Sequence, residues 1–125
     1  RHPRSDIFLP VAVPVGLGAA AAAESGGAKI IWGDSDGFLT TDYGSIILTS
    51  VMKQIGPAVF DTVSESADGN FTSEPYVGTL ENEGVGLAPF HDFEDAVPAE
   101  LQDQIAQYQE QIIAGDLVVE SPNAP

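Results

Sequence analysis

The sequence predicts one α/β domain built on parallel strands, and three observations point to this fold class. Residues 6–13 and 28–33 are apolar runs of strand character, and they flank an alanine-rich segment at residues 17–24 that favours helix. A strand, a helix and a strand this close together form a βαβ unit, which joins parallel strands. A second helical pattern covers residues 98–115, so helices and strands alternate along the chain.

Start and stop signals divide the first third of the chain into elements. Pro10 has no N–H to donate, which favours an edge position or the end of the first strand. A proline and two glycines at residues 14–18 predict a turn before the helix, and the glycine pair at 26–27 ends that helix. The strand of residues 28–33 then runs into a polar loop.

The rest of the chain is expected to alternate helices and short strands. In order, we expect a helix capped by Asp42 or Ser45 and running to Met52, a helix from Pro57 to Ser66, a turn at 68–70, a hairpin of strands 76–80 and 84–88, a helix from Pro98 to Gly115, and a strand at 117–119. The helix that begins at Pro98 has the clearest pattern, because Leu101, Ile105 and Tyr108 recur at helical spacing. Residues 120–125 are expected to form a flexible tail.

Composition excludes several classes of partner. The formal net charge of −15 disfavours nucleic acid and anionic membrane surfaces, because both are bound through basic patches. The absence of cysteine excludes disulfides and cysteine-based zinc sites. No apolar run approaches the roughly 20 residues that cross a bilayer, and the first residues lack the apolar core of a signal peptide. Since the chain starts without methionine, we expect its N-terminus to be a cut inside a longer protein.

Two carboxylates, Asp34 and Asp36, follow the strand of residues 28–33 directly and are the first candidates for a functional site. In open α/β sheets, ligands bind beyond the carboxyl ends of the strands. Lys53 is the only lysine or arginine after Lys29, whereas all but two of the 19 acidic residues lie in that same part of the chain. This isolation makes Lys53 a candidate ligand contact, and the alternative is a solvated surface lysine.

If residues 45–52 form the expected helix, Ser50 and Lys53 share one of its faces at spacing i, i+3. His91 is interpreted as a loop residue rather than a metal ligand, because no second histidine or cysteine accompanies it. No metal site and no cofactor are therefore predicted.

The segment from Gly16 to Ala21 has the pattern G-x-G-x-x-A, which imitates a dinucleotide-binding fingerprint. The imitation is imperfect, since Asp34 follows at slightly too short a distance and Pro14 crowds the turn. Two other interpretations stay open: a tight strand-to-helix turn, and a turn that also touches a smaller ligand.

The segment from Asp34 to Thr40, DSDGFLT, resembles the first motif of haloacid-dehalogenase-type phosphatases. The resemblance implies a nucleophilic Asp34, an acid/base Asp36 and a lysine, with Mg²⁺ held by further carboxylates. No later strand ends in the paired acids of such a magnesium site, and residues 91–95 (HDFED) are the nearest candidate. This enzyme is the alternative function, and simple surface-turn acids are the third interpretation.

Seven blocks of the sequence, in the right order, resemble the C-terminal part of the basic membrane protein family, the PnrA-like nucleoside-binding receptors of ABC importers. These blocks are DIFLPVA (6–12), PVGLGAA (14–20), DSDG (34–37), LTSVMK (48–53), AVFD (58–61), GVGLAP (84–89) and IIAGDL (112–117). They are spread over nearly the whole chain, from residue 6 to residue 117, whereas each enzyme motif explains one block. The resemblance is therefore the more specific signal.

The resemblance implies a type I periplasmic-binding-protein fold: two Rossmann-like lobes, each a three-layer αβα sandwich with a mainly parallel sheet, joined by a hinge. Residues 1–125 would form the second lobe and the closing hinge segments, and this fold is incomplete without the first lobe. Asp34 and Lys53 would contact the sugar of the nucleoside, with Asp36 beside them. The turn Pro14-Val15-Gly16 would line the cleft with backbone groups.

The function implied is that of the extracytoplasmic solute-binding component of an ABC importer, which performs no chemistry. It would bind a nucleoside, most simply a purine nucleoside, and pass it to a membrane permease. The location would be the periplasm or the cell surface, with a lipid anchor in the part that precedes this chain. Two departures from the family pattern, Val13 and Gly33, affect the ligand turn and the strand before Asp34. Trp32 is expected in the core, because it lies deeper in the strand.

Overall fold

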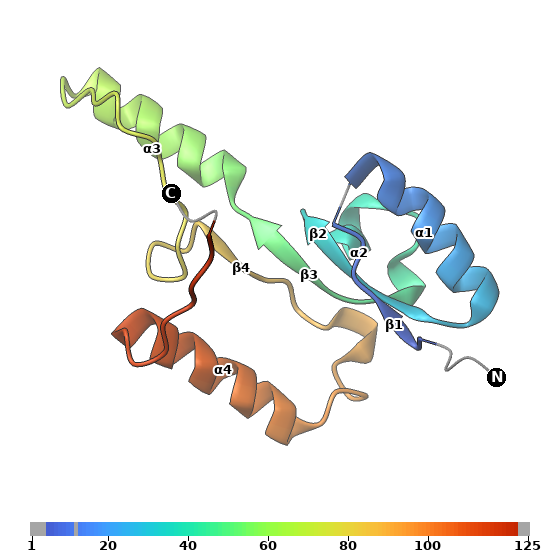
Figure 1. Ribbon diagram of the computed structural model, residues 1–125. Helices are drawn as coiled ribbons and strands as arrows, with labels where there is room; N and C mark the ends of the chain where they lie inside the picture. The colour runs from blue at the N-terminus through green and yellow to red at the C-terminus, as the bar shows by residue number, and fades with distance from the viewer. Residues whose placement is uncertain (1–4, 12, 123–125) are drawn as a thin grey trace. The chain divides into compact units, whose positions relative to one another are not determined.

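The computed structural model describes residues 5–11 and 13–122, and Figure 1 shows its helices and strands. In chain order these are β1 (Ile7–Phe8), α1 (Val13–Gly26), β2 (Lys29–Asp34), α2 (Gly37–Thr40), the 3₁₀ turn η1 (Gly44–Ile46), β3 (Ile47–Lys53), α3 (Ile55–Ala67), β4 (Val85–Leu87), the 3₁₀ turn η2 (His91–Phe93) and α4 (Ala99–Ala114). None of the helices in the described ranges combines the length and the apolar content that crossing a bilayer requires.

The chain divides into two compact units. The first unit contains the described residues up to Met52 together with Leu87–Val97, and the second contains Lys53–Gly86 together with the described residues from Pro98 onward. The first unit therefore holds β1, α1, β2, α2, η1, most of β3 and η2. The second unit holds α3, the loop that leads to β4, and α4.

The strands form one sheet with the order β1-β2-β3-β4. β1 pairs with β2 and β2 pairs with β3, both in parallel. Along β3 and β4, the N–H of Ala88 donates to the carbonyl of Ser50 and the N–H of Gln54 donates to the carbonyl of Gly84. The partner numbers fall on one strand as they rise on the other, which is the pattern of an antiparallel pair. The sheet is thus mainly parallel, as the sequence predicted.

The hydrophobic core lies in the first unit, where α1 packs on β2 (Figure 1). Ala20 and Ala23 are 0 % and 3 % exposed, and such small side chains let the helix approach the sheet closely. Ile30 and Trp32 fill the sheet side, and Trp32 is 4 % exposed. The predicted core position of Trp32 is therefore confirmed.

The second unit contains the two amphipathic helices α3 and α4. Neither α3 nor α4 contains a buried residue. In α3 the large apolar side chains of Ile55, Val59, Phe60 and Val63 are 57–71 % exposed. Gly115 ends α4 in the left-handed conformation with a φ of 79°, as the sequence predicted.

The helix expected to run to Met52 is wrong, because these residues form β3. Its sequence, ILTSVMK, is rich in β-branched side chains, which favour strands. Short apolar runs fit both the helical and the strand period, and the potential caps at Asp42 and Ser45 favoured the helix prediction. Ser50 and Lys53 therefore do not share a helix face. In a strand, residues three apart point to opposite sides, and Ser50 is buried while Lys53 is exposed.

The N-terminal boundaries also differ from the prediction. The first strand covers only Ile7 and Phe8, and α1 starts at Val13, so the expected turn at residues 14–18 lies inside the helix. Pro14 is compatible with this position because the first helical N–H groups have no partner within the helix. Ala12 and the side chains of Val13 and Pro14 lie outside the described residues.

Two further strands were predicted wrongly. Residues 76–80 are not a strand but part of a tight loop, in which Asn82 Oδ1 accepts the N–H groups of Thr79 and Gly84. The expected turn at 81–83 is present. Residues 117–119 are irregular rather than a strand. Of the expected tail at 120–125, residues 123–125 lie outside the described part.

Candidate functional site

Asp34 occupies a strained turn at the carboxyl end of β2. Its φ is +68°, in the region that L-residues rarely adopt, and the N–H of Ser35 donates to the carbonyl of Gly33 at 2.9 Å. A hydrogen bond across three residues with a positive φ at the centre is the rarer and more strained form of γ-turn. Strain of this kind accumulates at functional sites, where the surrounding structure maintains it. Asp34, the first candidate from the sequence, is therefore one of three described non-glycine residues with a positive φ, beside Glu83 and His91.

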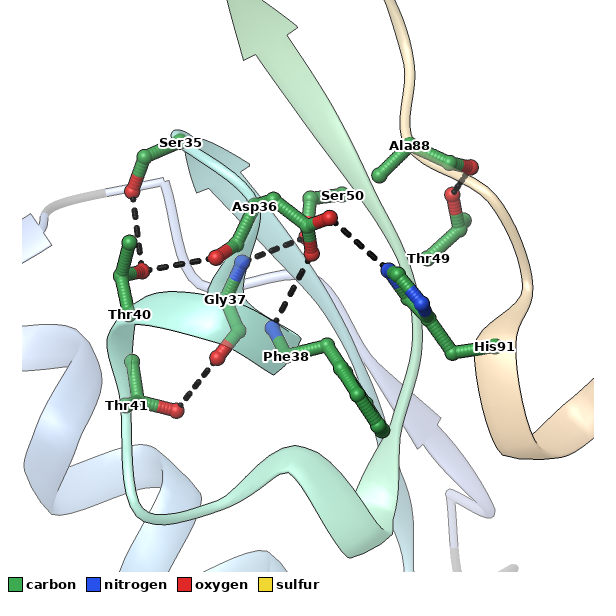
Figure 2. Close-up of polar contacts among 10 residues, drawn as sticks. All are labelled: Ser35, Asp36, Gly37, Phe38, Thr40, Thr41, Thr49, Ser50, Ala88 and His91. Atoms are coloured by element: carbon green, nitrogen blue, oxygen red, sulfur yellow. Dashed lines mark hydrogen bonds and ion pairs between the residues drawn. The ribbon is translucent and has the colours of Figure 1, made fainter.

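The residues after Asp34 form a short network of hydrogen bonds (Figure 2). Asp36 caps α2, and its Oδ1 accepts the N–H of Phe38 at 3.1 Å. The N–H of Gly37 donates to Ser50 Oγ at 3.0 Å, and Ser50 is fully buried on β3. These bonds attach the loop after β2 to the neighbouring strand, so the position of Asp34 is fixed from its C-terminal side.

His91 joins this network from a distant part of the sequence. Its Nε2 lies 2.8 Å from Asp36 Oδ2, and the two side chains are 18 % and 14 % exposed. The imidazole also stacks on the ring of Phe38, with ring centroids 4.1 Å apart and planes 10° apart. Figure 2 shows the His91 ring beside Phe38 and the second oxygen of Asp36 pointing at it.

Gly37 is required by the packing beneath the loop. A Cβ at this position would lie 2.5 Å from Trp32 Cγ and 2.8 Å from Ile47 Cδ1, distances that side chains do not adopt. The absence of a side chain lets α2 lie directly on the core. Gly44 acts similarly for Phe38, since a Cβ there would lie 3.2 Å from its ring.

The start of α1 lies near the same end of β2. A Cβ at Gly16 would be 3.0 Å from the Trp32 ring, so Gly16 allows close helix-to-sheet packing. This contact gives a packing reason for the first glycine of the fingerprint-like pattern. A Cβ at Gly33 would lie 4.0 Å from the carbonyl oxygen of Pro10. The segment that precedes α1 therefore runs alongside β2 just before Asp34, and Val15 is exposed in the first turn of α1.

Lys53 belongs to the second unit, where its surroundings are different. It lines a pocket of about 450 Å³ together with apolar residues of α3 and the loop residues Tyr76, Gly78 and Gly84. Lys53 and Asp34 each take part in at least one polar or electrostatic interaction. The structure therefore gathers Asp34 and Asp36 into one loop, near the helix start that contains Val15 and Gly16, and describes Lys53 in a separate unit.

The arrangement does not favour the phosphatase alternative. That chemistry requires Mg²⁺ held by several carboxylates. Within residues 5–11 and 13–122, no group of three or more histidine, cysteine, aspartate or glutamate side chains is placed to hold a metal ion. Asp36, the expected acid/base group, uses one oxygen to cap α2 and the other to meet His91.

Sequence reasoning missed two residues of this network. His91 was interpreted as an isolated loop residue because no second histidine or cysteine accompanies it, but its partner is a carboxylate 55 positions earlier. Ser50 was assigned to a helix face. A correct strand prediction for residues 47–53 would have placed Ser50 beside Trp32 in the sheet, next to the loop.

Comparison with known proteins gives a fold but no family. No family model and no curated protein matches the chain. A transcriptional activator of the comK gene from Bacillus halodurans aligns with a TM-score of 0.78 and 21 % identity, over 92 % of this chain and 39 % of its own. An ABC transporter solute-binding protein from Aeropyrum pernix K1 aligns with a TM-score of 0.78 and 16 % identity, over 94 % of this chain and 41 % of its own.

An ABC transporter solute-binding protein from Conexibacter woesei DSM 14684 gives a TM-score of 0.66 and 22 % identity, over 92 % of this chain and 37 % of its own. The chain thus spans about two fifths of the length of these proteins. At such identities the likeness concerns the fold. The predicted fold class is confirmed: the chain has the α/β architecture, with a mainly parallel sheet, found in lobes of solute-binding proteins.

Proposed function

We propose that this chain is the second lobe of an extracytoplasmic solute-binding protein that delivers a nucleoside to an ABC permease. The fold shared with two ABC transporter solute-binding proteins supports the solute-binding part of this proposal. The seven sequence blocks that resemble the nucleoside-binding family support the choice of ligand. In this proposal the nucleoside lies between this lobe and a first lobe outside the chain, and the lipid anchor also lies outside it.

The observation that carries the proposal is the strained turn at Asp34, at the carboxyl end of a buried parallel strand. A ribose presents two neighbouring hydroxyl groups, each of which can donate a hydrogen bond. An ionised carboxylate accepts two such bonds at once, and charge-assisted hydrogen bonds are about twice as strong as neutral ones. We therefore assign Asp34 the role of accepting the ribose diol.

The other proposed contacts follow from the same arrangement. In the first turn of α1, Val15 and Gly16 offer backbone N–H groups that have no partner within the helix, whereas Pro14 offers only its carbonyl. We assign Lys53 the role of donating a hydrogen bond to the sugar, as its place in the LTSVMK block implies. Asp36 would support ligand binding by holding the loop in place, because its Oδ1 already bonds the N–H of Phe38 and its Oδ2 already bonds His91.

The fold is also found in a transcriptional activator, but the charge of this chain argues against a similar role on DNA. Binding to nucleic acid depends on basic side chains that neutralise phosphates. Here the net charge is −15 and only four residues are lysine or arginine.

Calorimetric titration tests the proposal on the full-length protein that carries this chain and its first lobe. Adenosine, guanosine, inosine and cytidine are each titrated into the wild-type protein, the Asp34→Ala variant and the Asp42→Ala variant. Asp42 is an exposed carboxylate in the same unit and serves as the matched control. We expect tight, stoichiometric binding of at least one nucleoside, lost in Asp34→Ala and retained in Asp42→Ala.

A second assay separates the binding protein from the enzyme. The same samples receive p-nitrophenyl phosphate and Mg²⁺. Turnover that disappears in Asp34→Ala, without heat from any nucleoside, would overturn the proposal in favour of the phosphatase.

The 125-residue chain by itself should bind nucleosides weakly, because half of the cleft is absent. Submicromolar affinity in the isolated chain would contradict the two-lobe arrangement.

A further inference from the structure

The loop that carries Asp34 is held by a histidine from the other end of the first unit. Asp36 offers two oxygens: Oδ1 accepts the N–H of Phe38, and Oδ2 lies 2.8 Å from His91 Nε2. An ionised carboxylate only accepts hydrogen bonds, so the His91 tautomer that carries its proton on Nε2 is the one that would donate to it. One oxygen of Asp36 is thus hydrogen-bonded to α2, and the other is hydrogen-bonded to η2.

His91 is itself held in place by several contacts. Its ring stacks on Phe38, and its backbone adopts a φ of +47° that few non-glycine residues adopt. Two residues further on, the Phe93 ring receives Lys29 Nζ at 4.5 Å from its centroid. A cation over an aromatic face is attracted by the ring quadrupole, which ties η2 to the start of β2.

Ser50 connects the two segments through β3. Its Oγ accepts the N–H of Gly37, and its backbone carbonyl accepts the N–H of Ala88. The carbonyl of Ala88 in turn accepts the hydroxyl of Thr49 at 2.6 Å. The Asp34 loop and the segment that carries His91 are therefore both bonded to Ser50, and Thr49 adds a second bond to the His91 segment. The contact between Asp36 and His91 joins the two segments directly (Figure 2).

We propose that His91 is a positioning residue that pre-forms the Asp34 loop for ligand binding through its hydrogen bond to Asp36, while stacking on Phe38 orients the wild-type ring. The ligand part of this inference rests on the proposed function. A loop that already has its bound geometry loses less conformational freedom when the ligand arrives, which increases affinity without any contact to the ligand. His91 itself need not touch the nucleoside.

Two variants of His91 separate its two contacts, and a third variant is the control. His91→Phe keeps a flat ring for Phe38 and removes the donor to Asp36. His91→Gln keeps an amide donor of similar reach and removes the ring. Asp92→Asn is the control, since Asp92 is an exposed neighbour on the same 3₁₀ turn.

The first readout is amide hydrogen exchange of residues 35–38 in the ligand-free, full-length protein. We expect exchange at Gly37 and Phe38 to rise about tenfold in His91→Phe, because loops with fewer hydrogen bonds open more readily. The amide of Ile47 in the core should be unchanged, and His91→Gln and Asp92→Asn should resemble the wild type. Unchanged exchange in His91→Phe would overturn the proposal for any ligand.

The second readout is the ratio of the affinities for adenosine and 2′,3′-dideoxyadenosine. Loss of folded protein lowers the number of binding sites but leaves this ratio alone, whereas a misplaced Asp34 loses its preference for the diol. The ratio should fall about threefold to tenfold in His91→Phe and recover in His91→Gln. An unchanged ratio would contradict the positioning role.

The two readouts also separate this inference from the proposed function. If the wild type binds no nucleoside, the proposed ligand fails and the claim about the ligand fails with it. The exchange result then still decides whether His91 holds the loop. If His91→Phe does not fold, the Asp36→Ala variant removes the same bond from the other side, together with the cap on Phe38. Wild-type exchange at Gly37 in that variant would overturn the inference.

Discussion

The two units of the chain differ in whether their apolar side chains are buried or exposed. In the first unit, α1 and the strands bury seven residues in one cluster: Ala20, Ala23, Ala28, Ile30, Trp32, Ile46 and Ile47. In the second unit, α3 and α4 have apolar faces but bury no residue. Helices of this kind gain most of their stability from packing of the apolar face. The first unit therefore supplies the rigidity, and the polar network around Asp36 is built on it.

The largest effect that this comparison predicts is for the central side chain of the core. Trp32→Ala should lower the free energy of unfolding by about 3–5 kcal/mol, since it leaves a large cavity. Phe60→Ala removes another large aromatic side chain, but Phe60 is 71 % exposed on α3, so the loss should be below about 0.5 kcal/mol. Urea denaturation of both variants measures the difference. Equal losses would mean that the apolar face of α3 is packed as tightly as the core.

Gly37 allows a second test, at the point where the loop meets the core. Gly37→Ala should cost about 1–3 kcal/mol, because the added methyl group would overlap Trp32 and Ile47. Gly56→Ala in α3 is the matched control. No atom lies within 4 Å of its built Cβ, and alanine is the better helix former by about 1 kcal/mol. Thermal unfolding should therefore shift in opposite directions, and a shift in the same direction would contradict the packing described for Gly37.

Ser50 tests the polar link between the loop and β3. Ser50→Ala removes the acceptor of the buried Gly37 N–H and should cost about 1–3 kcal/mol, the usual penalty for an unpaired buried group. Ser45→Ala, at an exposed position before β3, is the control and should change stability by less than about 0.5 kcal/mol. A Ser50→Ala protein as stable as the control would show that the loop is not anchored through this hydroxyl.

The smallest predicted effect concerns the strain at Asp34. Asp34→Ala and Asp34→Gly both remove the carboxylate, but only glycine adopts a positive φ without cost. The glycine variant should be more stable than the alanine variant by about 1 kcal/mol. Denaturation of the two variants side by side isolates the backbone term. An alanine variant that is equally stable would mean that the turn relaxes when the carboxylate is removed.

The sequence predicted the elements whose local signals agree with their surroundings. The existence of α1 and its glycine stop, the buried strand before Asp34, and α4 with its cap at Gly115 were predicted correctly, whereas α1 starts earlier than expected. β3 was missed because Ile46, Ile47 and Val51 fit a helical period as well as a strand, and only pairing with β2 decides between them. Asp34 and Asp36 were found from their place after a strand. His91 and Ser50 could not be found in this way, because their partners are distant in sequence.

The central claim is that Asp34 accepts hydrogen bonds from a ribose diol, and a cycle of four titrations tests it most directly. Adenosine and 2′,3′-dideoxyadenosine are titrated into the full-length wild-type protein and into Asp34→Asn. We expect adenosine to lose about 10- to 100-fold in affinity in Asp34→Asn, while the dideoxy analogue, already weak, loses little. Equal losses for the two ligands, or no binding of adenosine to the wild type, would contradict the claim.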